Sequence, residues 1–157
     1  MDNQQIENAV ITYSQSLLKI AYTYMKSTAD AEDIVQDAFI QYLRSAPEFD
    51  NDEHEKAWLI RVTINLCKNS LKSSWRTKRA ELDENLMSSL NEDEGFLLSE
   101  VLKLPEKFRT VIHLHYYEGY EIKEIAEIIG QNPSTVGVWL KRGRERLKKV
   151  LEGDFYE

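Results

Sequence analysis

The chain has little of what builds disulfides, strands or membrane spans. Its 157 residues include one cysteine, three prolines and six glycines. The single cysteine, Cys67, excludes an internal disulfide and is typical of a reducing compartment. No basic start is followed by an apolar stretch, and no apolar run approaches the length of a membrane-spanning helix. We therefore expect a cytoplasmic protein that is not inserted into a membrane.

Motifs that carry catalysis or hold a cofactor are also missing. The sequence contains no Cys-x-x-Cys, no His-Glu-x-x-His and no phosphate-binding glycine loop. His113 and His115 are two residues apart, which places them on different sides of a helix and argues against a metal pair. Cys67 lies on an apolar stripe and is expected to be a buried, inert thiol. We expect a protein that is not an enzyme and that needs no metal or cofactor.

Basic residues are in deficit overall but are concentrated in two blocks. The net charge is −7, which by itself argues against binding to nucleic acid. Residues 61–80 nevertheless hold six Lys or Arg and no acid, whereas residues 81–100 hold seven Asp or Glu and no base. Residues 141–149 hold six Lys or Arg against one Glu. These two basic blocks could each bind phosphate, although the chain as a whole is acidic. They therefore predict either two DNA contacts or none.

The apolar residues predict an all-α fold. They recur at steps of three and four, and no strand-like alternation with turn dipeptides is present. We predict helices over residues 6–24, 30–44 and 54–74, with a loop at 47–55. Residues 76–93, first basic and then acidic, have little apolar periodicity and predict a linker. The expected architecture is two small helical domains, residues 1–75 and 94–157, joined by that linker.

Residues 121–149 have the spacing of a helix-turn-helix. Two helices that cross at a steep angle need a small residue at the crossing, and Ala126 is suited to that position. The turn needs a residue that tolerates a positive φ, which Gly130 does. Asn132 is the expected N-cap of the second helix. Inside that helix the expected apolar anchors are Val136 and Leu140.

The second of these helices is predicted to contact DNA. Its N-terminal residues would face base edges in a major groove, and its Lys and Arg would contact phosphates. The residues assigned to this surface are Ser134, Thr135, Val138, Lys141, Arg142 and Arg144. A helical hairpin with a merely solvated basic end is the alternative, and the small residues at the required positions argue against it.

The helix predicted at residues 54–74 has two distinct faces. One is apolar and suits a core: Ala57, Ile60, Ile64, Cys67 and Leu71. The other follows the same rhythm of three and four but is aromatic, polar or basic: Trp58, Arg61, Asn65, Lys68, Lys72 and Arg76. One helix therefore offers a buried face and a face suited to nucleic acid.

Two sets of motifs resemble those of bacterial sigma factors. The stretch from Asp30 to Leu43 (DAEDIVQDAFIQYL), residues 57–65 (AWLIRVTIN) and the pair Lys68-Asn69 resemble their second conserved region. Residues 104–109 (LPEKFR), residues 120–126 (YEIKEIA) and the pair Thr135-Val136 resemble their fourth region. In this order, separated by a linker and without other regions, they resemble an extracytoplasmic-function (ECF) sigma factor of the sigma-70 family.

The resemblance implies several partners. Such a protein binds the RNA polymerase core, through the β′ clamp and the β flap, and directs it to promoters with a particular −35 and −10 element. Matched residue by residue, the implied clamp contacts are Asp33, Gln36 and Asp37. An acidic edge on an amphipathic helix can pair with basic residues of a partner helix. Members of the class also usually have an anti-sigma factor, which we expect here.

The resemblance also assigns the −10 element to the helix predicted at residues 54–74. Asn65 matches a family position near a base that has been flipped out of the stack. The residues that would hold the DNA backbone are Arg61, Lys68, Asn69, Lys72 and Arg76. Trp75 is more exposed by its position and is expected to stack on a base. Trp58 and Phe49 stay open, because each could contact DNA or pack against the protein.

The recognition helix departs from many relatives, which carry basic or hydroxyl residues directly after the valine. This chain has Gly137-Val138-Trp139 there, so contact with methyl groups and phosphate clamping should replace much of the polar base readout. Two other classes of protein are weighed against a sigma factor. A one-component regulator with a sensing N-terminal domain would not need the basic face at residues 61–79. A purely protein-binding adaptor would need neither basic block.

Overall fold

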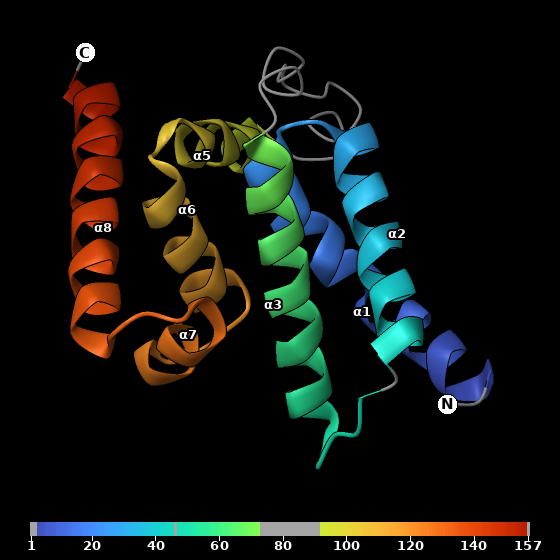
Figure 1. Ribbon diagram of the computed structural model, residues 1–157. Helices are drawn as coiled ribbons and strands as arrows, with labels where there is room; N and C mark the ends of the chain where they lie inside the picture. Colours follow the sequence, from blue (N-terminus) through green and yellow to red (C-terminus); the bar gives the residue numbers. More distant parts are fainter. Residues whose placement is uncertain (1–2, 46, 73–91, 157) are drawn as a thin grey trace. The chain divides into compact units, whose positions relative to one another are not determined.

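The computed structural model describes residues 3–45, 47–72 and 92–156, and all regular structure in those residues is helical (Figure 1). The chain divides into two compact units, Met1–Asp83 and Glu84–Glu157. The predicted all-α class is confirmed. Trp75, Arg76 and most of the predicted linker lie outside the described residues. In the described part of the chain, no helix is long and apolar enough to cross a membrane.

Within its described residues the first unit has three helices, each packed against the other two. They are α1 (Asn3–Met25), α2 (Thr28–Ser45) and α3 (Asp52–Leu71). Their apolar stripes meet in one core, because residues at steps of three and four share a face of a helix. The largest side chains that are fully buried there include Leu17, Ile20, Tyr22, Tyr42, Leu59, Ile60 and Ile64.

The connection between α1 and α2 is short and locally capped. Lys26 adopts the left-handed conformation with φ 59°, and its N–H donates to the Tyr22 carbonyl at 2.9 Å. This closes the C-terminal end of α1. At the start of α2 the Ser27 hydroxyl accepts a hydrogen bond from the Asp30 N–H at 3.3 Å. The helices can therefore reverse direction within two residues and pack side by side.

Helix α3 begins earlier than the sequence pattern predicts. We predicted a start near His54 and a loop through Glu55, but the helix begins at Asp52. The Asn51 side chain accepts a hydrogen bond from the His54 N–H at 2.9 Å and so caps the helix. Acids in the first turn stabilise that end, because the N–H groups there carry partial positive charge. The acidic stretch interpreted as loop is in part a helix N-terminus.

The second unit contains α5 (Glu92–Lys103), α6 (Glu106–Ile112), α7 (Ile122–Ile129) and α8 (Pro133–Tyr156). A single π-helical turn, η2 (His113–Tyr117), continues α6. The helix α5 begins two residues before position 94, where we predicted the second domain to start. Arg109 is buried on α6, and its Nη1 donates to the Leu102 carbonyl of α5 at 3.1 Å. This bond ties α5 to α6 and so positions the two helices beside α8.

Candidate DNA and polymerase interfaces

Helix α7 is held at both ends by local hydrogen bonds. At its start Glu121 and Glu124 form a capping box, in which Glu124 Oε1 accepts from the Glu121 N–H at 3.0 Å. At its end Gly130 has φ 71°, and the N–H groups of Gly130 and Gln131 both donate to the Ala126 carbonyl. Glycine adopts a left-handed conformation without the steric cost that a side chain brings, so Gly130 forms the predicted turn.

Helix α8 crosses α7 through the anchors that the spacing predicts. The Asn132 carbonyl accepts a hydrogen bond from the Val136 N–H at 3.1 Å, as expected of an N-cap residue. Ala126 lies buried at the crossing, and Val136 and Leu140 are buried on α8. The helix-turn-helix expected from the sequence is therefore present, with the opposite side of α8 left open to a partner.

The open side of α8 gathers most of the residues assigned to the −35 element. Ser134, Val138 and Lys141 are exposed and lie on one stripe, because they are spaced by four and three residues. Arg142 is exposed beside Lys141, whereas Thr135 is half-buried. Glu145 continues the same stripe. Its exposed carboxylate would repel phosphate, which confines the DNA-suited surface to the first three turns of α8.

Sequence reasoning missed Glu145, although its distance of four residues from Lys141 could have indicated its position.

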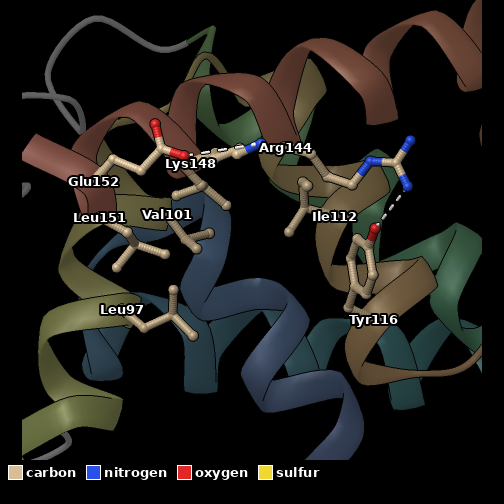
Figure 2. A pocket seen from close by; sticks show the side chains of 9 residues that line it. Leu97, Val101, Ile112, Tyr116, Arg144, Lys148, Leu151 and Glu152 are labelled. Atoms are coloured by element: carbon tan, nitrogen blue, oxygen red, sulfur yellow. Dashed lines mark hydrogen bonds and ion pairs between the residues drawn. The ribbon is translucent and has the colours of Figure 1, made fainter.

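Arg144 lies at the edge of this surface. It is three residues after Lys141, about 60° away around the helix axis, and on the opposite flank of the stripe from Arg142. Its Nη1 donates to the Tyr116 hydroxyl at 3.1 Å (Figure 2). The Arg144 guanidinium therefore borders a second surface of the unit, between α8 and η2.

That second surface is an apolar groove with a volume of about 610 Å³. Helix α5, the end of α6 and the η2 turn supply one side and the C-terminal half of α8 the other (Figure 2). The lining residues are Leu97, Val101, Ile112, Tyr116, Arg144, Leu147, Lys148, Leu151 and Glu152. Leu97, Tyr116 and Leu151 are 45 %, 55 % and 43 % exposed, which is a large apolar area to leave in water. Sequence reasoning did not identify this groove, because its walls come from separate helices.

Helix α3 brings the described residues of the −10 assignment onto one face. Arg61, Asn65, Lys68 and Lys72 follow one another at steps of four and three, and all four are exposed. Asn69 is exposed next to this stripe. The stripe lies away from Ile60, Ile64 and Cys67, which are buried as predicted.

Trp58 and Phe49 pack against the protein. The Trp58 ring meets the Tyr42 ring edge-on with centroids 5.7 Å apart, and the Phe49 ring lies 6.0 Å from Tyr42 and 5.9 Å from Trp58. The Tyr42 hydroxyl donates to Glu55 Oε2 at 2.6 Å. Burial, reinforced by this hydrogen bond, raises the pKa of Tyr42 to about 12. The cluster fastens the loop before α3 to α2.

Helix α2 presents the acidic edge expected for a polymerase contact. Asp33, Gln36 and Asp37 are exposed at spacings of three and four residues, so they share one side of the helix. Ile40 and Leu43 follow on α2 and are 43 % and 53 % exposed. The helix thus combines an acidic end with an apolar end on its open surface, which suits a helical partner with basic and apolar residues.

Models of two conserved protein regions match the two units. The model described as sigma-70 region 2 matches residues 9–77, and the model described as sigma-70, region 4, matches residues 97–147. The chain belongs to the sigma-70 family of RNA polymerase sigma factors. The resemblance to the ECF class that the motifs indicated is thereby confirmed.

Curated relatives of this sigma factor carry ECF names. It is 29 % identical over 170 residues to the ECF RNA polymerase sigma factor SigW of Bacillus subtilis, with 96 % of this chain and 90 % of SigW covered. It is also 29 % identical over 170 residues to the ECF RNA polymerase sigma-E factor of Escherichia coli K12, covering 96 % and 88 %. A one-component regulator is not favoured, because sigma region 2 matches where its sensing domain would lie.

Two solved structures share the fold of this sigma factor. One is CnrH in complex with the cytosolic domain of CnrY, with TM-score 0.75, 23 % identity and coverage of 98 % of this chain and 91 % of CnrH. The other is the sigma factor RpoE in complex with the anti-sigma factor NepR from Bartonella quintana. Its TM-score is 0.71 at 18 % identity, covering 95 % of this chain and 98 % of RpoE.

Proposed function

We propose that this sigma factor binds the polymerase core, recognises the −35 and −10 elements and promotes melting of promoter DNA. The observation that carries the proposal is the presence of two different DNA-suited faces, one on α8 and one on α3. Residues 1–75 would serve the clamp and the −10 element, and residues 94–157 the −35 element. Residues 76–93 would connect them.

The −35 element would be bound by the first three turns of α8. Ser134, Thr135 and Val138 are nearest the N-terminal end and would face the base edges, while Lys141 and Arg142 would contact phosphates. Arg144 would contribute at most a contact from the flank of the helix, since its guanidinium is engaged by Tyr116. The exposed Val138 favours apolar contact over hydrogen-bonded readout.

The −10 element would be bound by the exposed stripe of α3. Arg61, Lys68 and Lys72 carry the charge that holds a backbone, and Asn65 sits between them with an amide that can hydrogen-bond an unpaired base. Asn69 lies beside this stripe, and Trp75 and Arg76 would extend it beyond the described residues. Holding the unpaired strand offsets part of the few kcal/mol that unstacking costs.

The polymerase core would be bound at two surfaces. Asp33, Gln36 and Asp37 on α2 would meet basic residues of the β′ clamp, where opposite charges steer association and fix the register. The apolar groove of the second unit would take a helix of the β flap. Its volume and exposed Leu97, Tyr116 and Leu151 suit an amphipathic helix that inserts apolar anchors.

An anti-sigma factor would hold this sigma factor inactive in the cytoplasm until a signal arrives. Support comes from the solved proteins of the same fold, one of which is a complex with the anti-sigma factor NepR. The role proposed for the chain is recognition rather than catalysis, with the bond-forming chemistry carried out by the polymerase and with no cofactor in the chain itself.

Transcription with purified core polymerase tests the proposal. Core and the full chain are incubated with a library of duplexes of randomised upstream sequence, and the transcribed templates are sequenced. We expect transcripts only when core and chain are both present, with two short enriched blocks upstream of the start. Binding of the chain alone as a dimer, with no affinity for core, would contradict the proposal and favour a regulator.

A pair of charge reversals provides the matched control. Lys141→Glu should abolish selection of the upstream block, because it places a carboxylate on the DNA-suited stripe of α8. Lys103→Glu makes the same change on α5, where the exposed lysine already pairs with Glu100 at 3.0 Å, and should leave the selection intact. Equal effects of the two variants would mean that the α8 stripe has no special role.

A further inference from the structure

Gly137 is the one glycine with described surroundings whose presence the protein itself does not explain. Gly119 and Gly130 have φ 79° and 71°, a conformation that other residues rarely adopt. At Gly143 an added Cβ would lie 3.1 Å from Ile112 Cγ1, tighter than ordinary van der Waals contact, so packing favours a residue without a side chain. At Gly137 φ is ordinary, and apart from its chain neighbours and the adjacent backbone of α8 itself, no heavy atom lies within 4 Å of the place that a Cβ would take.

Gly137 lowers the stability of α8 in the N-terminal turns that are proposed to contact DNA. Gly137 is the fifth residue of α8, and glycine in a helix interior is less favourable than any residue except proline. Neither backbone conformation nor neighbouring side chains call for it. A glycine is also the residue that lets a ligand approach the backbone closely. The open space above Gly137 is therefore suited to a group that arrives from outside the protein.

The surroundings of Gly137 indicate the chemistry of that group. Ser134 and Lys141, three residues before and four after, border it on the helix surface and are exposed. Val138 follows it and is 45 % exposed. Gly137 lies beyond the first four N–H groups of α8, so its own N–H is used within the helix and is not free for an anion. The notch formed by Gly137 and Val138 is apolar.

We propose that this notch receives the 5-methyl group of a thymine in the −35 element, which makes Gly137 a specificity-determining residue. The inference rests on the proposed function, in which the N-terminal turns of α8 lie in the major groove. There the thymine methyl is the apolar group that base pairs present, whereas other base edges offer donors and acceptors. Against Gly137 and Val138 those polar edges would lose their hydrogen bonds to water without replacement. Lys141 and Arg142, which follow along α8, hold the phosphates and set the depth of approach.

Substitution at the notch and removal of the methyl group can be combined in one experiment. The probe is the promoter duplex selected by wild-type chain and core, with each −35 thymine replaced singly by deoxyuridine, which lacks the methyl. Wild type should lose roughly fivefold in closed-complex affinity at one of these positions. Gly137→Ala should bind the thymine duplex about tenfold more weakly, because its Cβ fills the notch. At that same position deoxyuridine should improve binding by Gly137→Ala.

Stability separates this effect from misfolding. Gly137→Ala should raise the thermal midpoint of the full chain by roughly 2–8 °C, since alanine favours the helix and nothing obstructs it. Gly143→Ala, a glycine-to-alanine change on the buried side of α8, is the matched control. It should show the same loss at deoxyuridine as wild type.

The proposal is overturned if Gly137→Ala binds the thymine duplex as well as wild type does. It is also overturned if deoxyuridine weakens binding equally in both proteins. Failure of wild type to initiate with core at any promoter would instead overturn the proposed function.

Discussion

Helices α3 and α8 each present a basic face that we propose contacts DNA, yet the groups between the charges differ. On α3 the charges of Arg61 and Lys68 flank the amide of Asn65, and none of the exposed large apolar side chains of the described residues lies on this helix. On α8 the corresponding stripe contains Val138 and ends at Glu145. Amides can hydrogen-bond the edges of an unpaired base, whereas a short apolar surface suits the groove of an intact duplex. Positive charge alone therefore does not tell which form of DNA a helix binds.

The largest effect should come from a change that weakens binding to the polymerase core, because the proposed DNA contacts of α3 and α8 are then both lost. Asp33→Lys combined with Asp37→Lys turns attraction to the clamp into repulsion while leaving the buried side of α2 untouched. We expect core affinity to fall at least about a hundredfold in a fluorescence titration, from two charge pairs of about 1.5 kcal/mol each.

Glu7→Lys combined with Glu48→Lys changes the net charge equally at exposed positions outside this surface and should have little effect. Similar losses for both double variants would show that only net charge matters.

The next largest effect should come from a change that destabilises the unit containing α8 and leaves the unit containing α3 intact. Gly143→Val places a branched side chain where even an added Cβ would lie 3.1 Å from Ile112 Cγ1 and 3.4 Å from Phe108 Cβ. Overpacking of this kind costs about 1–3 kcal/mol, which should lower the midpoint of the second unit by roughly 5–20 °C in calorimetry. Gly137→Val, where the space is open, should be much milder. Equal destabilisation by both would mean that α6 does not press on α8 at Gly143.

A smaller effect should separate melting from duplex binding. Asn65→Ala should leave core binding and closed complexes nearly unchanged but reduce open complexes about three- to tenfold, through the loss of one hydrogen bond. Permanganate reactivity of unpaired thymines measures this, and a pre-melted bubble template should rescue part of the loss. Gln15→Ala, an exposed amide on α1, is the control. Unchanged reactivity on the duplex would remove Asn65 from the DNA-binding surface.

The smallest effect distinguishes two arginines on α8. Arg142→Ala should lower the slope of log affinity against log salt by about 1 unit in closed-complex titrations, because one phosphate contact is lost. Arg144→Ala should leave the slope unchanged and instead weaken whatever occupies the groove beside Tyr116. A lower slope for Arg144→Ala as well would return this residue to the DNA contacts.

Much of the fold followed from local pattern. The stripes of α1 and α3, the turn at Gly130 and the anchors Val136 and Leu140 all depend on periodicity or on backbone preference, which act within a few residues. The start of α3 was placed two residues too late, because an acidic stretch suits both a loop and a capped helix N-terminus. The side-chain hydrogen bond of Asn51 decides between the two.

The sequence by itself determined the all-α class, the helix-turn-helix and the two faces of α3, since each follows from spacing along one helix. Only the tertiary structure decided that Trp58 packs against Tyr42 and that Arg144 turns toward Tyr116. Only the tertiary structure explains why position 143 is a glycine, and only in it do separate helices form the apolar groove beside α8. The physical reason is the same in each case: these features depend on side chains from different helices, whose meeting is fixed by packing and leaves no periodic signal in the chain.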